Sequence, residues 1–173
     1  MPNHILLTGE IGAGKSTLVR RLLTHTKRPL YGFVTERIPI NVHGVACTYI
    51  HAANARERNY TQHNLVGYYD GKAGHALPAV FDSVGVPLLS AASDGLLLMD
   101  ELGFFESDAT CFCNCVLRAF DASIPILAVV KARQTPFLNE VRAHQNARLF
   151  TVTPENRDAL YEELVRLIAT WNT

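Results

Sequence analysis

The sequence has no long hydrophobic run and little of the composition that marks disordered or secreted chains. Its 173 residues include 11 glycines, 8 prolines and 4 cysteines, and 48% of them are hydrophobic. This apolar content suffices for a sizeable core and excludes a disordered chain, a collagen-like repeat and a small disulfide-stapled protein. No apolar run approaches the roughly 20 residues that cross a bilayer, and the start lacks the features of a signal peptide. We therefore expect a cytoplasmic protein with reduced thiols and no membrane partner.

No excess of positive charge points to a nucleic acid as a partner. The 16 Lys and Arg residues balance 16 Asp and Glu residues. Proteins that bind nucleic acids normally carry a basic excess, because counterion release from phosphates supplies much of their affinity. Residues 1–86 hold nine basic and five acidic residues, whereas residues 87–173 hold seven and eleven. A basic first half favours a small polyanionic ligand, although opposed surface charges that keep the protein soluble explain the bias equally well.

Strand and helix patterns alternate along the chain. Short apolar runs predict strands, and apolar residues at helical spacing predict helices. The strands are expected at residues 5–8, 31–35, 45–50, 95–99, 126–130 and 149–152, with a turn at 41–44. The helices are expected at residues 15–26, 77–92 with a break near Gly85 and Pro87, 106–121 and 153 to about 171, and residues 54–64 as a surface loop. This alternation predicts an α/β fold with a mostly parallel central sheet, in a single domain spanning residues 1–173.

Residues 9–16 carry the pattern G-x-x-x-x-G-K-[ST] between a predicted strand and a predicted helix. This is the Walker A motif, or P-loop, which cradles the phosphates of a nucleoside triphosphate such as ATP or GTP with main-chain N–H groups. Lys15 is expected to bring positive charge to the β- and γ-phosphates, and Ser16 to offer its hydroxyl to Mg²⁺. We expect nucleotide contacts from Gly9, Glu10, Ile11, Gly12, Ala13, Gly14, Lys15, Ser16 and Thr17.

A second motif follows the strongest buried-strand signal, residues 95–99, which runs directly into Asp100 and Glu101. An apolar strand that ends in Asp is the Walker B pattern, in which the carboxylate holds the Mg²⁺ shell. A Glu directly after that Asp suits a general base that orients and deprotonates water. The alternative is a strand that simply leaves the core into solvent. We predict that Asp100 binds the metal and that Glu101 is the base.

These motifs and the residues around them resemble the THEP1-type nucleoside-triphosphatase family over nearly the whole chain. The resemblance rests on five segments, residues 7–16, 32–36, 66–69, 100–106 and 155–158. It implies a P-loop fold of the RecA-like type, a three-layer sandwich around the sheet. It also implies slow, Mg²⁺-dependent hydrolysis of several nucleoside triphosphates to diphosphate and phosphate.

The family's functional residues fall on matching positions of this chain. The resemblance assigns the family roles to Lys15, Ser16, Asp100 and Glu101. Glu106 matches the last acidic residue of the family's Asp-Glu-x-Gly-Lys-Met-Glu segment. Phe104 stands where that segment has its lysine, so this chain must manage without the lysine or use another cation.

Phosphoryl transfer also calls for a positive charge near the transition state, such as an arginine finger. Lys131 and Arg133 follow the predicted strand 126–130, whose end is expected beside the Walker B strand. Arg133 is the better candidate, because it is always charged and donates in a fork. A surface salt bridge is the alternative for both residues.

Two further segments are expected near the nucleotide. Arg157 follows the last predicted strand and could stack on the base, although helix capping by Thr153 or Asn156 is the simpler account of this segment. Thr35 or Glu36, at the end of the second predicted strand, could approach the γ-phosphate.

The cysteines and histidines do not form a metal-binding pattern. Cys111, Cys113 and Cys115 are spaced two apart, so at most the first and last share a helix face, and a structural zinc site wants four ligands. We interpret the three cysteines as small buried hydrophobic residues and the histidines as surface or loop residues.

Two other functions stay open beside hydrolysis. In a small nucleotide or metabolite kinase, an acceptor would replace water and residues 131–142 would form a lid. In a nucleotide-gated binding module, nucleotide would switch a partner; the absence of Asn-Lys-x-Asp argues against a strict GTP switch. The sequence names no protein partner.

Overall fold

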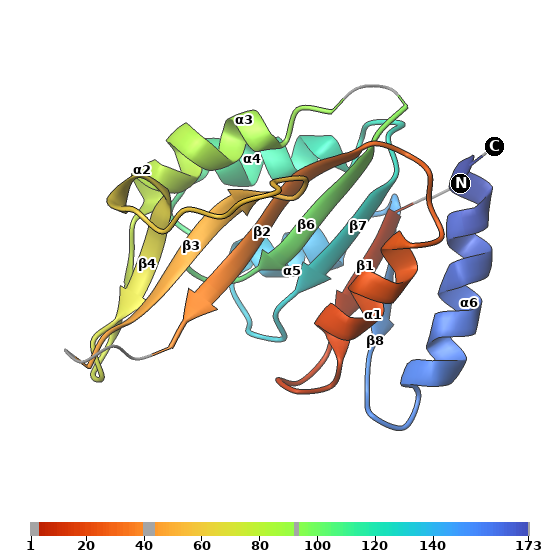
Figure 1. Ribbon diagram of the computed structural model, residues 1–173, viewed down its shortest axis with the longest axis horizontal. Helices are drawn as coiled ribbons and strands as arrows, with labels where there is room; N and C mark the ends of the chain where they lie inside the picture. Colours follow the sequence, from red (N-terminus) through yellow and green to blue (C-terminus); the bar gives the residue numbers. More distant parts are fainter. Residues whose placement is uncertain (1–3, 40–43, 92–93, 173) are drawn as a thin grey trace.

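The structure, a computed structural model, describes residues 4–39, 44–91 and 94–172. Its strands form one eight-stranded sheet in the order β5-β4-β3-β2-β6-β7-β1-β8 (Figure 1). They are β1 (His4–Thr8), β2 (Leu30–Ile38), β3 (Ala46–Ala52), β4 (Leu65–Tyr69), β5 (Gly74–Ala76), β6 (Leu96–Leu102), β7 (Ile126–Val130) and β8 (Ala147–Thr151). The strands from β2 through β6, β7 and β1 to β8 pair in parallel, whereas β2, β3, β4 and β5 pair in antiparallel fashion.

Strand β7 separates the strand before the P-loop from the strand that carries Asp100. Val129 of β7 is in register with Leu7 of β1 on one side and with Asp100 of β6 on the other. The carboxyl ends of parallel strands meet at one edge of a sheet, where ligands bind in open α/β folds. The P-loop and the acidic end of β6 therefore lie at the same edge.

Helices cover both faces of the sheet, so the domain has three layers. Alternate residues of a strand point to opposite faces. On one face, Ile5 and Leu7 pack with apolar residues of α1 (Lys15–Leu23) and α6 (Arg157–Ala169). On the other face, Leu6 packs in a core with residues of α4 (Thr110–Ala119) and α5 (Pro136–Arg142). Both clusters are fully buried around the central strands, which explains why those strands are apolar throughout.

The predicted α/β fold with its mostly parallel sheet is confirmed, but several elements differ from the predictions. Strands β4 and β5, which were not predicted, extend the sheet in antiparallel fashion. The helix expected at 77–92 is interrupted near Gly85, as predicted, and consists of α2 (Pro78–Val80), a π turn η2 (Phe81–Gly85) and α3 (Val86–Leu88), so it ends earlier than expected. The loop at 54–64 ends in a 3₁₀ turn, η1 (Gln62–Asn64), and α6 continues into another, η3 (Thr170–Asn172). Most of the predicted turn at 41–44 lies outside the described residues.

The interpretations of the cysteines and of the histidines were wrong for some of these residues. Cys113 is buried as predicted, but Cys111 is exposed, because it lies on the solvent side of α4. His4 and His51 are buried rather than on the surface, with 3% and 6% exposure. The Nε2 atom of His4 lies within hydrogen-bond distance, 3.0 Å, of the main-chain oxygen of Phe120.

No helix in the described ranges is both long and apolar enough to cross a membrane. Those ranges also contain no cluster of three or more His, Cys, Asp or Glu side chains that could hold a metal ion.

Candidate functional site

The P-loop joins β1 to α1 through three glycines in backbone conformations that other residues rarely adopt. Gly9, Gly12 and Gly14 have φ angles of 144°, 84° and 94°. Positive φ carries little steric cost only without a Cβ atom, so the glycine spacing of the motif follows from the shape of the turn. Ile11 at its tip is fully exposed. The loop therefore exposes main-chain N–H groups with few side chains around them, and such N–H groups bind phosphate.

Two of these glycines also allow close approaches by the β8–α6 segment. A Cβ atom at Gly9 would overlap the main-chain oxygen of Val152. A Cβ atom at Gly14 would lie 2.8 Å from the Cδ and Nη1 atoms of Arg157. The structure thus brings Arg157, the first residue of α6, against the end of the P-loop. Thr153 and Asn156, the two candidate caps of this helix, form a hydrogen bond in which the Asn156 N–H donates to Thr153 Oγ1 over 3.2 Å.

The ammonium group of Lys15 lies over the P-loop. Its Nζ donates hydrogen bonds to the main-chain oxygens of Gly9 over 2.7 Å and Glu10 over 2.8 Å. Ser16 and Thr17 follow in the first turn of α1, and both are exposed. The first N–H groups of a helix have no partner within it, and the helix dipole is positive there. Charge, hydroxyls and free N–H groups therefore gather at one place.

Asp100 and Glu101 lie at the end of β6, both partly buried. Burial and the adjacent Glu101 raise the pKa of Asp100 to about 6, although the positive charges of Arg58 and Lys15 oppose this rise. The described residues give the Asp100 carboxylate no ion pair. A half-buried carboxylate with too little positive charge around it is a place where a cation would be stabilised.

The end of β2 supports this acidic pair. The main-chain N–H of Glu101 donates to Thr35 Oγ1 over 3.2 Å. Glu36 points instead to a neighbouring loop, where it pairs with Arg58 at 2.7 Å and accepts a hydrogen bond from Tyr60 over 2.9 Å. Of the two residues expected near the γ-phosphate, Thr35 is thus the one that contacts the acidic pair.

Sequence reasoning missed Arg58, which lies close enough to Asp100 to lower the pKa of that carboxyl group. It stands in a polar stretch without a motif, and only the fold brings this stretch to the carboxyl ends of β2 and β6. No local sequence signal could have singled it out.

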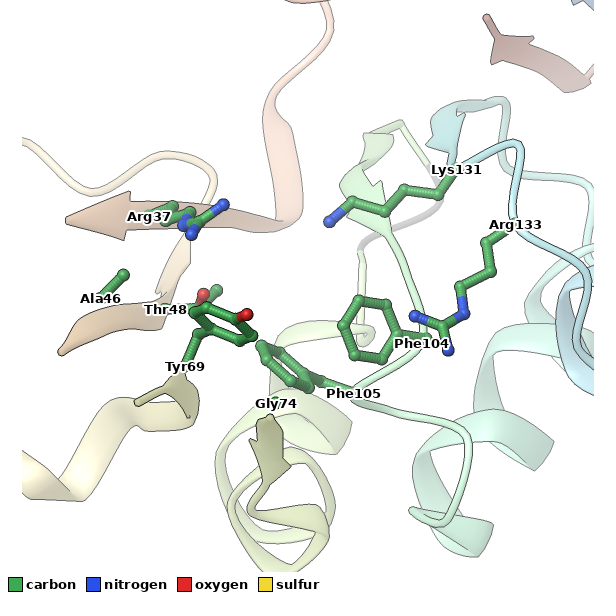
Figure 2. Close-up of a pocket in the computed structure, with 9 residues that line it drawn as sticks. All are labelled: Arg37, Ala46, Thr48, Tyr69, Gly74, Phe104, Phe105, Lys131 and Arg133. Atoms are coloured by element: carbon green, nitrogen blue, oxygen red, sulfur yellow. The ribbon is translucent and has the colours of Figure 1, made fainter. Parts of the chain in front are cut away.

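Two cationic side chains lie near Phe104, which stands at the position of the family's lysine. The guanidinium of Arg133 lies 4.2 Å from the centre of the Phe104 ring, and the ammonium of Lys131 lies 5.7 Å from it (Figure 2). An aromatic face attracts cations. Two side chains from the end of β7 therefore bring positive charge to the region of the missing lysine. Neither Lys131 nor Arg133 forms an ion pair with a described residue, contrary to the salt-bridge alternative.

Glu106 is buried under the turn that follows β6 and binds its main chain. Its side chain is 2% exposed, and its Oε1 accepts a hydrogen bond from the main-chain N–H of Gly103. Burial raises the pKa of Glu106 to about 7, despite the opposing effects of that hydrogen bond and of the positive charge on Lys131. Glu106 therefore holds the turn that carries Phe104.

Comparison with known proteins agrees with this geometry. The profile of a family described as NTPase matches residues 4–165. The chain belongs to this family. It is similar to the nucleoside-triphosphatase THEP1 of Thermofilum pendens, with 30% identity over 177 residues that cover 96% of each chain. It is also 26% identical to the nucleoside-triphosphatase THEP1 of Aquifex aeolicus over 179 residues, which cover 95% of this chain and 98% of the relative.

Two solved structures share the fold. The crystal structure of THEP1 from Aquifex aeolicus matches with a TM-score of 0.74 at 24% identity, over 95% of this chain and 98% of the other. The solution structure of a human cancer-related nucleoside triphosphatase matches with a TM-score of 0.64 at 20% identity, over 96% and 97% of the two chains. The fold is therefore a P-loop NTPase fold, and the resemblance found in the sequence is confirmed.

Proposed function

We propose that the chain is a Mg²⁺-dependent nucleoside triphosphatase that hydrolyses ATP, GTP and other nucleoside triphosphates to diphosphate and phosphate. The observation that carries this proposal is the position of Glu101. It follows Asp100 at the end of β6. Only β7 lies between β6 and the strand that leads into the P-loop, and both motifs lie at the same edge of the sheet. We also propose a single domain that acts in the cytoplasm on free nucleotides and needs no nucleic acid.

The chain's own residues fit a magnesium ion. Mg²⁺ prefers oxygen ligands and uses one or two protein groups together with substrate phosphates. The hydroxyl of Ser16 and the carboxylate of Asp100 would hold it, and the raised pKa of Asp100 shows that nearby positive charge does not offset the burial of its carboxylate. When bound, the ion supplies neutralisation of the negative charge on the β- and γ-phosphates.

The remaining groups act on the nucleotide and on water. Main-chain N–H groups of residues 9–17 hold the phosphates, Lys15 offsets the charge on the β- and γ-phosphates, and Arg157 contacts the nucleotide beside Gly14. Glu101 accepts a proton from a water molecule while the water oxygen bonds to the γ-phosphorus. The bond from that phosphorus to the bridging oxygen breaks, and the nucleoside diphosphate leaves. Arg133 stabilises the charge that develops in this transition state.

Phosphate release from ATP, GTP, CTP and UTP, with Mg²⁺ and with a chelator, tests the proposal. We expect release from several nucleotides that needs Mg²⁺ and falls by about 10²–10⁴ in Glu101→Gln, because the general base is lost. Nucleotide binding should persist in this variant. The control is Glu162→Gln, an exposed residue of α6. Hydrolysis by Glu101→Gln at the parental rate would show that Glu101 is not the base.

A further inference from the structure

A cavity of about 490 Å³ lies between the antiparallel strands and the turns that follow β6 and β7 (Figure 2). This volume lies within the range of ligand sites for small molecules, roughly 300–1,000 Å³. Its lining comes from strands β2, β3, β4 and β5 and from the turns after β6 and β7. The lining residues are Arg37, Ala46, Thr48, Tyr69, Gly74, Phe104, Phe105, Lys131 and Arg133.

Three positive side chains converge on this cavity, and no carboxylate lines it. Arg37 comes from the end of β2, whereas Lys131 and Arg133 follow β7. Figure 2 shows Arg37 and Lys131 extending toward each other from opposite walls. None of the three forms an ion pair with any residue that the structure describes. Like charges that face each other repel unless an anion lies between them, so the cavity is suited to a negatively charged group.

Aromatic rings form another part of the wall. The ring centres of Phe104 and Phe105 are 4.5 Å apart, and the side chain of Tyr69 is 38% exposed. Phe105 is held firmly, because a Cβ atom at Gly67 would lie 2.7 Å from its ring and one at Gly74 would lie 3.2 Å from it. Fixed aromatic faces offer a surface on which a planar group of a ligand can stack.

The cavity is separate from the P-loop, and a neighbouring cavity connects its lining to Glu101. No residue of the P-loop lines it. A smaller cavity of about 30 Å³ shares four of its residues, Thr48, Phe104, Phe105 and Lys131, and is lined in addition by Thr35, Glu101 and Glu106. The two cavities therefore adjoin each other close to Glu101.

We propose that this cavity binds a second small molecule, distinct from the nucleoside triphosphate, that carries a phosphate group and a planar ring. Arginine donates in a fork that matches phosphate oxygens, so Arg37 and Arg133 bind the phosphate and Lys131 adds charge. The ring stacks against the aromatic wall. A nucleoside monophosphate has both features and serves as the probe.

The test is equilibrium binding of AMP, measured by calorimetry on the full chain without nucleoside triphosphate. AMP should also bind to Lys15→Ala, because the cavity contains no P-loop residue. Affinity should fall about tenfold or more in Arg37→Ala and in Arg133→Ala, since each change removes a charge-assisted hydrogen-bond donor. Arg166→Ala, which changes an exposed residue of α6, is the matched control and should bind AMP as the parent does. Thermal melting checks that each variant is folded.

Each alternative outcome overturns part of this assignment. Parental affinity in both cavity variants, or no binding of AMP to the parent, would overturn the site. Loss of AMP binding in Lys15→Ala alone would place AMP on the P-loop instead. Equal affinity for inorganic phosphate and AMP would overturn the assignment of a ring-bearing ligand, and equal affinity for adenosine would overturn the role of the charge. Because triphosphate hydrolysis is not measured, failure here is distinguishable from failure of the proposed hydrolase function.

Discussion

The side chain of Arg157 occupies the space that a side chain at position 14 would need. Gly14 precedes α1 and Arg157 begins α6, so the two helices start side by side at the P-loop. A Cβ atom at Gly14 would lie 2.8 Å from both Cδ and Nη1 of Arg157. This contact connects the end of the phosphate loop to the segment after the last strand.

We expect Arg157→Ala to weaken nucleoside triphosphate binding by about 10- to 100-fold, because a charge-assisted donor next to the P-loop is lost. Fluorescence titration with a nucleotide analogue measures the affinity. Arg157→Lys keeps the charge but loses the fork, so it should recover only part of the loss. An affinity that does not change in Arg157→Ala would mean that this arginine only packs against the loop.

A substitution at Gly32 of β2 tests the packing of the sheet rather than the nucleotide site. Its φ angle is 97°, and a Cβ atom there would overlap the main-chain oxygen of Leu98 on β6. We expect Gly32→Ala to destabilise the protein by about 3 kcal/mol or more, because the strands must move apart and the new residue is strained. Urea denaturation measures this loss.

Gly71 provides the matched control, since its φ angle is 86° but nothing lies within 4 Å of an added Cβ atom. Gly71→Ala should carry only the cost of positive φ, about 1 kcal/mol. Equal losses in the two variants would show that close packing of β2 and β6 is not the cause.

Local patterns predicted the parts of the structure that local forces determine. Residues 9–16 predicted the P-loop and its flanking strand and helix, because the motif, the glycines and the apolar spacing all lie within one short segment. The carboxyl end of β7 was correctly expected beside β6, since parallel α/β topology follows general rules. Strand β5 was missed because it has only three residues, and none of them is fully buried. Its pairing with β4 stabilises it, and a short sequence carries no sign of such pairing.

The cavity and Arg58 could not be predicted for the same reason. Arg37 and Arg133 are almost a hundred positions apart in the chain, and only the order of the strands brings them to one cavity. Phe104 looked like the loss of a family cation, whereas the structure places the guanidinium of Arg133 on its ring. Long-range packing decides such relationships, and a single sequence does not record it.

Arg133 itself gives a kinetic prediction that rests on the proposed hydrolysis. We expect Arg133→Ala to lower kcat by about 10³-fold, the lower end of the effect of an arginine finger, with little change in nucleotide affinity. Single-turnover phosphate release at saturating nucleotide measures this rate. Phe104→Leu, which removes only the aromatic face beneath the guanidinium, should have a smaller effect. A parental kcat in Arg133→Ala would restrict this residue to the neighbouring cavity.

We expect the buried carboxyl group of Glu106 to make the stability of the protein depend on pH. Burial raises the pKa of its carboxyl group from the ordinary 4.5 to about 7. Between these two values the folded protein holds a proton that the unfolded chain has released, so the free energy of unfolding falls as pH rises from about 4.5 to about 7. Glu106→Gln keeps an acceptor for the Gly103 N–H but does not titrate. The variant should therefore gain relative to the parent as pH rises, by about 3 kcal/mol at pH 8 compared with pH 4.

Urea denaturation of both proteins across this pH range measures the difference. The carboxyl group of Asp100 also has a raised pKa, but it is present in both proteins and cancels in the comparison. Glu162→Gln, at an exposed position, should follow the parental curve. If the curves of Glu106→Gln and the parent ran parallel from pH 4 to pH 8, the pKa of Glu106 would be the same in the folded and unfolded states, and the carboxyl group would be ionised in the folded protein at neutral pH.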